Sequence, residues 1–186
     1  MSTAVLSTPK LLTAEEYLLL PDNVDRRELR RGVVVVMNPP GFRHGEVCGN
    51  IHFYLASFVR EHQLGRALTN DSGIITERDP DTVRGADISF YSYKRVPKGQ
   101  SPLGYAGASP EIVFEVVSPY NTRKDIASKT GEYLQAGINV VCVVDAQHGT
   151  VELHYPDQPS ATLRGNDPLT FAELNGFSLP VRKLFE

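Results

Sequence analysis

The spacing of apolar residues predicts three helices along the chain. Apolar positions three and four residues apart in "EVCGNIHFYLASFVREHQLG" predict a helix that ends at Gly65, with an inward face made of Val47, Ile51, Tyr54, Leu55, Phe58 and Val59. The segment "TAEEYLLLP" predicts a short helix, because Thr13 and Glu16 have the spacing of a capping box. The segment "NTRKDIASKTGEYLQAG" predicts a third helix, capped by Asn121 or Thr122 and ended by a glycine.

Runs of β-branched and aromatic residues around these helices predict the strands of one sheet: "GVVVVMNPP", "RALTND", "SGIITE", "GADISFYS", "EIVFEVVS", "INVVCVVD" and "TVELHYP". Residues 95–110 are rich in Gly, Pro and Ser and predict a loop, and a short helix is predicted near "GNDPLTFAEL". This order predicts a single α/β (α+β) domain over residues 11–186, a mixed central sheet flanked by helices, after a flexible tail at 1–10. Residues 111–145 predict parallel strands joined by a right-handed crossover.

Composition narrows the class of protein. The 186 residues are 41% hydrophobic and 22% charged, the balance of a globular domain. The apolar runs are too short to span a bilayer and the start lacks the apolar stretch of a secretory signal, so we expect a cytoplasmic protein with no membrane contact. Two cysteines exclude a disulfide framework or a Cys-rich metal site. The five histidines lack paired zinc spacing, and we interpret each as a surface or loop residue.

Charge gives no global signal for a nucleic-acid partner. The net charge of −3 provides no overall attraction to phosphate, so any such binding must come from local clusters. Four arginines between residues 26 and 31 form one cluster, and Arg123 with Lys124 forms another. We interpret both clusters as solvated surface.

One charged residue interrupts the apolar run at 111–118, which is typical of a strand buried on both faces. Glu115 lies between Phe114 and Val116, where an ionised carboxylate loses its water at a cost on the order of several kcal/mol. Alternation of side chains puts Glu115 on the same face as Val113 and Val117. A partner that stabilises this carboxylate is therefore expected on that face.

Two further acids are candidates for the same place. Asp87 begins the strand "DISF", and Glu28 in "RRELRRG" precedes the first predicted strand. Two carboxylates side by side repel each other, so one of them tends to protonate unless a cation lies between them. Mg²⁺ or Mn²⁺ suits such a place, because these ions take one or two carboxylates, water and phosphate as ligands. Asp87 and Glu115 are therefore candidate metal ligands.

Helical geometry adds a lysine to this group. Lys129 lies on the flank of the inward face of the third helix and can reach back to Glu115, whereas Lys124 points to solvent. Two acids, a metal ion and a lysine suit the hydrolysis of phosphodiesters. Simpler interpretations stay open. Asp125 and Lys129 have the spacing of a surface ion pair, Asp87 could cap a turn, and Glu115 could pair with a buried arginine.

Four segments resemble, in order, the pattern of a known family: "RRELRRGVVVVMNPPGFRHGEVCGNIHFYL", "RGADISF", "PEIVFEVVSPYNTRKDIASKTGEYLQAGINVVCVVD" and "NGFSLPVRKLF". This is the Uma-two family, restriction-endonuclease-like proteins of the PD-(D/E)XK nuclease superfamily that are abundant in bacteria. The resemblance runs from about Leu11 to the C-terminus. The block "EVVSP" followed by "KD", "K" and "Y" on a helix that ends in "AG" is its specific part.

The resemblance implies a restriction-endonuclease-like core and a site for Mg²⁺ or Mn²⁺. Asp87 and Glu115 match the acids of the family's motif, and Glu28 matches the acid of its N-terminal motif. Val117 fills the usual place of the motif lysine, and Lys129 matches a lysine that has moved to the following helix. Three further residues match motif positions without an assigned role: Ser118, Asp125 and Tyr133.

The chain also departs from the family pattern. Ala86 stands where a proline usually precedes the aspartate, and no second acid follows the glycine of "RELRRGV". Val141 and Cys142 stand where an aromatic residue is usual. None of these changes removes a candidate metal ligand.

Together these observations predict a metal-dependent endonuclease that acts on DNA, with Asp87, Glu115, Lys129 and Glu28 as its site. Two other functions stay open: a catalytically silent nucleic-acid-binding or regulatory protein that kept the fold, and a hydrolase of another phosphate substrate. The acidic net charge weakens the DNA interpretation, while the complete set of site residues argues against the silent one. A cut through both strands of a duplex generally needs two active sites, so analogy with the family suggests a homodimer.

Overall fold

The computed structural model of the chain describes residues 10–21, 26–119 and 121–186. Nine of the ten residues of the predicted tail at 1–10 lie outside these ranges. The helices are α1 (Ala14–Leu18), α2 (Phe42–Glu61), α3 (Arg123–Gln135) and the 3₁₀ helix η1 (Val181–Leu184). The strands are β1 (Arg27–Arg30), β2 (Val33–Val36), β3 (Gly65–Glu77), β4 (Thr82–Ser92), β5 (Ile112–Val116), β6 (Val140–Asp145), β7 (Thr150–His154), β8 (Ala161–Arg164), β9 (Pro168–Leu169) and β10 (Leu179–Pro180).

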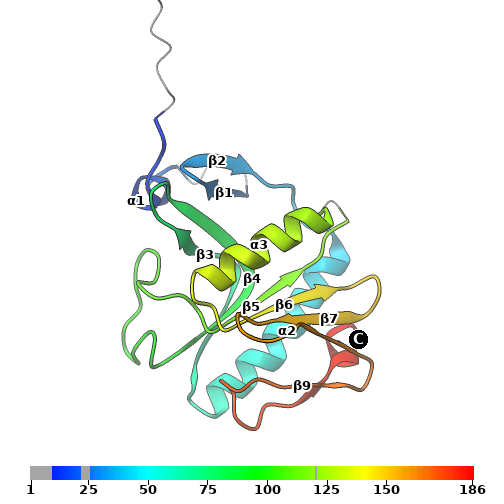
Figure 1. Cartoon of the computed structure of the whole chain (residues 1–186). Helices are drawn as coiled ribbons and strands as arrows, with labels where there is room; N and C mark the ends of the chain where they lie inside the picture. The colour runs from blue at the N-terminus through cyan, green and yellow to red at the C-terminus, as the bar shows by residue number, and fades with distance from the viewer. Residues whose placement is uncertain (1–9, 22–25, 120) are drawn as a thin grey trace, which may run out of the picture.

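In the described part of the chain, a mixed sheet of eight strands forms the centre of the molecule. Its order is β2-β1-β4-β5-β6-β7-β8, with β3 paired to β4. The β5–β6 pair is parallel and its strands are joined through α3, as the sequence predicts, whereas the other pairs are antiparallel. Helix α3 covers one face of the sheet and α2 the other (Figure 1). The predicted fold class, a mixed sheet flanked by helices, is confirmed.

The two faces of the sheet bury separate cores. Under α2 the predicted inward residues Val47, Ile51, Leu55 and Val59 are at most 2% exposed, and the C-terminal segment around Phe171 and Leu184 closes the same core. Under α3, Tyr133 packs on Val113 and Val141. Full burial of such a side chain contributes about 1.5–3 kcal/mol, so these two cores hold both helices against the sheet.

Strand β4 has three neighbours, and this arrangement creates a fork in the sheet. Strand β3 follows one edge of β4 along its whole length. The other edge is shared, because β1 pairs only at Val83 and β5 pairs from Ile88 to Phe90. Between these two contacts, residues 84–87 of β4 have no strand beside them on that edge. The backbone groups of this gap must therefore find side-chain partners.

The structure corrects several predicted element boundaries. Helix α2 begins at Phe42, one turn before the predicted start, and ends at Glu61. Gly65 does not end it but begins β3, where a Cβ atom would lie 2.1 Å from the backbone oxygen of Tyr91. The two strands predicted around "RALTND" and "SGIITE" are one strand with a bulge, at which Asn70 and Asp71 have positive φ angles.

Other differences lie at the two ends of the chain. The charged segment "RELR" forms β1, which pairs with β2, so Glu28 does not precede the first strand but lies within it. Strand β8 was not predicted. The segment "GNDPLTFAEL" forms β9 and turns in place of a short helix, and the helical turn is η1 further on. Among the described residues, no helix combines the length and apolar character that crossing a membrane requires.

Candidate functional site

Glu28 fills the gap in the fork beside β4. It comes from β1 and is 4% exposed. One of its oxygens, Oε1, accepts the backbone N–H of Gly85 at 3.3 Å, and the Gly85 carbonyl accepts Lys129 Nζ at 3.0 Å. A glycine is also needed at position 85 because of the bulge in β3 beside it: a Cβ atom on residue 85 would lie 2.8 Å from the Cβ atom of Asp71. Side chains from β1 and α3 thus replace the missing strand at this point.

A buried arginine holds the carboxylate of Glu28 in place. Arg84 is 6% exposed and donates to Glu28 Oε2 at 2.7 Å and to both carboxylate oxygens of Glu132 at 2.7 Å each. Arg30 adds a contact to Glu28 Oε2 at 3.0 Å. Burial raises the pKa of Glu28, but the charges of Lys129 and Arg84 outweigh burial and lower it to about 2. Glu28 is therefore ionised across the neutral range.

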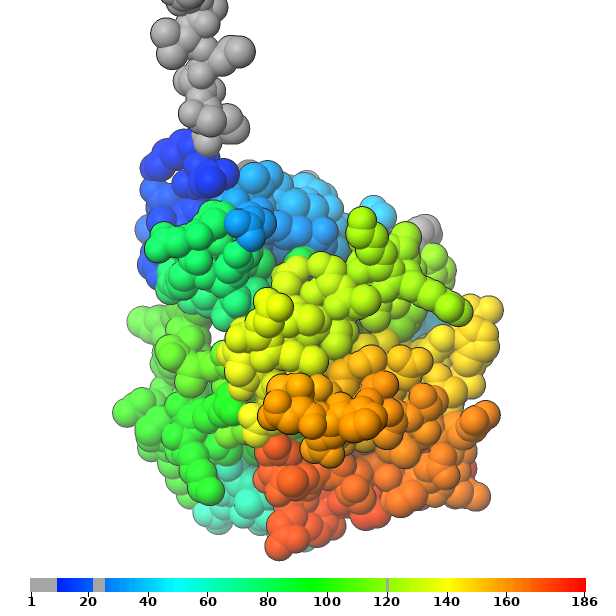
Figure 2. All heavy atoms as spheres, in the orientation of Figure 1, coloured from blue at the N-terminus to red at the C-terminus, as the bar shows by residue number. Residues whose placement is uncertain are grey.

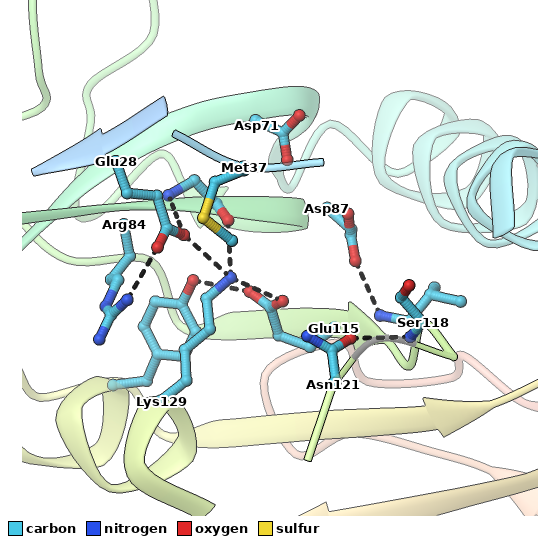
Figure 3. A network of polar contacts seen from close by, with 12 residues as sticks. Glu28, Met37, Asp71, Arg84, Asp87, Glu115, Ser118, Asn121 and Lys129 are labelled. Atoms are coloured by element: carbon cyan, nitrogen blue, oxygen red, sulfur yellow. Dashed lines mark hydrogen bonds and ion pairs between the residues drawn. The ribbon is translucent and has the colours of Figure 1, made fainter. Parts of the chain in front are cut away.

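Glu115 and Lys129 form the centre of the site, and Figure 3 shows their side chains meeting beside Glu28. Lys129 Nζ lies 2.8 Å from Glu115 Oε2 and 3.2 Å from Glu28 Oε1. The hydroxyl of Tyr133, one turn later on α3, donates to Glu115 Oε1 at 2.7 Å. This confirms that Lys129 reaches back to β5, whereas Lys124 is exposed.

Burial and neighbouring acids oppose ionisation of Glu115. Its side chain is 17% exposed. The pKa of Glu115 is raised to about 7, chiefly by burial. The charge of Lys129 opposes this rise, and the negative charge of Asp87 adds to it. Lys129 keeps its charge, since Glu115 and Glu28 outweigh its own burial and raise its pKa. Lys129, which contacts Glu115, is thus shared with Glu28.

Asp87 lies at the end of the fork and has different neighbours. It is 6% exposed, and its Oδ2 accepts the backbone N–H of Val116 at 2.8 Å, which joins β4 to β5 beyond their last ladder pair (Figure 3). His44 Nε2 lies 3.3 Å from Oδ2, and Arg26 Nη2 lies 3.3 Å from Oδ1. Burial raises the pKa of Asp87, but His44 and the Val116 N–H outweigh it and lower that pKa.

Two cavities border these acids, one at Asp87 and the other at Glu115. One of about 150 Å³ is lined by Arg26, His44, Cys48, Asp71 and Asp87. The other, of about 100 Å³, lies between the first hairpin and α3, which adjoin in Figure 2, and is lined by residues that include Arg30, Met37, Glu115 and Lys129. A ligand in the first cavity would meet Asp87, and a ligand in the second would meet Glu115 and Lys129.

The structure brings the four predicted residues into one region of the fork. The strands that carry Asp87 and Glu115 are adjacent. A cation shared between these two acids stays a prediction, as do the catalytic roles. The simpler pairing of Asp125 with Lys129 is wrong, because Asp125 closes the capping box of α3 with Thr122.

Contacts also identify the partners of Glu115 and Ser118. Glu115 pairs with a lysine and a tyrosine, whereas the buried arginine of this region serves Glu28 and Glu132, so the pairing of Glu115 with a buried arginine is wrong. Ser118 donates its backbone N–H to Asn121 Oδ1 at 2.8 Å, at the turn that leads into α3.

Sequence reasoning missed the residues around Asp87. The interpretation of His44 as a surface or loop residue is wrong, since it lies in α2 and its side chain is 10% exposed. A signal existed: His44 is three and seven residues before Val47 and Ile51, so it continues their inward face once the helix is extended by a turn. Arg26 and Arg84 carried no comparable signal, because their partners come from distant parts of the chain.

Comparisons with known proteins concern the family and the fold of the chain. Residues 14–182 match the profile of the family described as "Uma2: Putative restriction endonuclease". Among solved structures, the fold matches one described as a "putative nuclease belonging to DUF820" from Anabaena variabilis, at a TM-score of 0.78 and 20% sequence identity, over 94% of this chain and 97% of the other. Curated proteins gave no match.

Proposed function

The chain belongs to the Uma2 family, and we propose that it is a Mg²⁺- or Mn²⁺-dependent endonuclease that hydrolyses phosphodiester bonds in DNA. The observation that carries the proposal is the meeting of Glu115 and Lys129 beside Asp87 in a fork between strands. An acid and a lysine fourteen residues apart in the sequence lie 2.8 Å apart there, next to two cavities.

The donor atoms fit a hard divalent cation. A carboxylate offers about four lone pairs; Asp87 has three partners and Glu115 has two, so each keeps part of that capacity free. Mg²⁺ and Mn²⁺ are bound by one or two carboxylates together with water and substrate phosphate. The raised pKa of Glu115 also fits, because an added positive charge relieves the repulsion that contributes to it. Asp87 and Glu115 would hold the ion, which supplies Lewis-acid activation of phosphate and water.

The chain's own residues then act through position and charge. Lys129 Nζ donates to Glu115 and to the carbonyl of Gly85, and it forms an ion pair with Glu28 at 3.2 Å. Lys129 therefore stabilises the ionised form of Glu115, and it reaches a substrate oxygen only by exchanging one of these contacts. Glu28 keeps Lys129 in place, and Tyr133 fixes the second oxygen of Glu115. Such pre-arranged charges are among the largest contributions to rate enhancement.

The substrate and the assembly follow from the same proposal. DNA is the phosphodiester substrate that the family description supports. A cut in both strands calls for a second active site, so we also propose that the protein acts as a homodimer. Light scattering coupled to gel filtration measures that state directly.

The test is a cleavage assay with matched variants. Purified protein is incubated with plasmid, single-stranded DNA and RNA, each with Mg²⁺, with Mn²⁺ and with a chelator. We expect metal-dependent nicking or linearisation of plasmid that Asp87→Asn and Glu115→Gln abolish. Binding of DNA without cleavage under every condition would refute the enzyme and favour the silent binding protein.

A further inference from the structure

We propose that His44 is a nitrogen ligand of the cation held at Asp87, and that the site therefore binds Mn²⁺ more tightly than Mg²⁺. The inference rests on the proposed function, because Asp87 is one of the metal ligands of that proposal. It concerns which ion the site prefers and which residue decides this preference.

The position of His44 is the first observation. It lies in the first turn of α2, and its side chain is 10% exposed and faces the sheet beside Asp87. The distance from Nε2 to Asp87 Oδ2 is 3.3 Å. Neighbouring ligands of one ion, each bound at about 2.1 Å and at right angles, lie about 3 Å apart. The imidazole and the carboxylate are thus already spaced like two adjacent ligands of a single ion.

The second observation is the contact on the other side of the ring. His44 Nδ1 lies 3.5 Å from Cys48 Sγ, one turn further along α2. One ligand atom each from His44, Cys48 and Asp87 lies within 4.8 Å of the others. A metal-binding histidine usually has its second nitrogen held by another group, which fixes the orientation and tautomer of the ring. We assign this role to Cys48 and the role of ligand to Nε2.

The surroundings leave room for an ion with its water. The cavity beside His44 and Asp87 has about 150 Å³, several times the share of one water molecule in liquid. Arg26 approaches the other oxygen of Asp87, Oδ1, and is itself paired with Asp71. The cation that we propose would therefore meet Asp87 through Oδ2, where His44 lies.

The kind of donor atom decides which ion the site binds more tightly. Imidazole nitrogen suits first-row transition ions, whereas Mg²⁺ is bound through oxygen and keeps much of its water. A site of two carboxylates alone distinguishes Mn²⁺ from Mg²⁺ weakly. The nitrogen of His44 beside the carboxylate of Asp87 adds affinity chiefly for Mn²⁺.

The experiment measures binding without relying on cleavage. Calorimetric titrations of the full chain with MnCl₂ and MgCl₂ give both dissociation constants, and pulsed electron paramagnetic resonance of the Mn²⁺-loaded protein detects coupling to a ligating ¹⁴N. We expect ¹⁴N coupling in the wild type and its loss in His44→Ala. The same variant should bind Mn²⁺ about tenfold or more weakly, with a smaller change for Mg²⁺.

Controls keep the outcomes apart. His52→Ala removes a histidine two turns along the same helix, which contacts a backbone carbonyl at 3.4 Å, and should leave both dissociation constants unchanged. His44→Gln serves as a second variant if His44→Ala loses its native circular dichroism. Mn²⁺ binding that depends on Asp87 but shows neither ¹⁴N coupling nor an effect of His44 variants would overturn the inference alone. No binding of either ion to the wild type would overturn the proposed function as well.

Discussion

Glu28 and Asp87 are both buried carboxylates beside β4, yet their neighbours differ in kind. Glu28 is surrounded by Lys129, Arg84 and Arg30, and its contacts extend to the backbone of Gly85. Asp87 has a backbone N–H, an imidazole and one arginine at 3.3 Å, and it borders a cavity. The first acid is saturated by fixed cations, whereas the second keeps room for one that comes from solution.

The difference teaches how a buried charge is recognised as structural or functional. A carboxylate with a complete set of fixed cations supports the fold and orients its partners. A carboxylate with incomplete neutralisation and access to a cavity is a candidate for ligand binding. Glu115 lies between these cases, because one lysine serves it together with Glu28. The following variants separate the two roles.

The largest effect is expected for Glu115→Gln. Cleavage should fall about a thousandfold or more, equivalent to about 4 kcal/mol of transition-state stabilisation, because a metal ligand is lost. The free energy of unfolding without metal should stay within about 1 kcal/mol or rise slightly, since the pKa of about 7 shows that the folded state disfavours ionised Glu115. Plasmid cleavage and urea denaturation at pH 8 measure both. A large loss of stability would make Glu115 half of a structural ion pair.

Arg84→Met should produce the largest loss of stability. It removes a 6% exposed guanidinium and leaves Glu28 and Glu132 without their shared partner, which costs about 3–5 kcal/mol for a buried pair. Arg26→Met is the matched control, since this side chain is 28% exposed and its removal should cost about 1 kcal/mol or less. Chemical denaturation compares the two. Equal losses would mean that both sides of the fork are structural.

Lys129→Ala should lower cleavage by roughly a hundredfold, because it removes the cation that stabilises ionised Glu115. Lys124→Ala, on the exposed side of the same helix, should change only weak and salt-sensitive substrate binding. Single-turnover rates at two salt concentrations distinguish the effects. Equal rates for the two variants would remove Lys129 from the site.

The smallest of the four effects concerns pH. Because the pKa of Glu28 falls from 4.5 in the unfolded chain to about 2 in the fold, its stabilisation is complete above pH 4.5 and is lost as the pH falls towards 2. The loss should reach about 2 kcal/mol between pH 4 and pH 2. Glu28→Gln should flatten this part of the stability curve, whereas Glu61→Gln, at the exposed end of α2, should not. Thermal melts across that pH range provide the measurement.

Local sequence was enough to determine most of the elements and one half of the site. The capping boxes of α1 and α3, the inward face of α2 and the buried run of β5 each depend on residues a few positions apart. The same holds for the approach of Lys129 to Glu115, because a strand, a short turn and a helix fix the geometry of residues fourteen positions apart. These features are encoded in periodicity and spacing, which a single sequence displays directly.

Only the tertiary structure decided the rest. β1 is a charged segment without a strand pattern that pairs with β2, and its Glu28 contacts Arg84 and Lys129, 56 and 101 positions away. His44 becomes a candidate site residue only because the fold places the start of α2 beside Asp87 of β4. The physical reason is that burial of a charge depends on partners that the fold brings together, and no local pattern records which distant residue will supply the opposite charge.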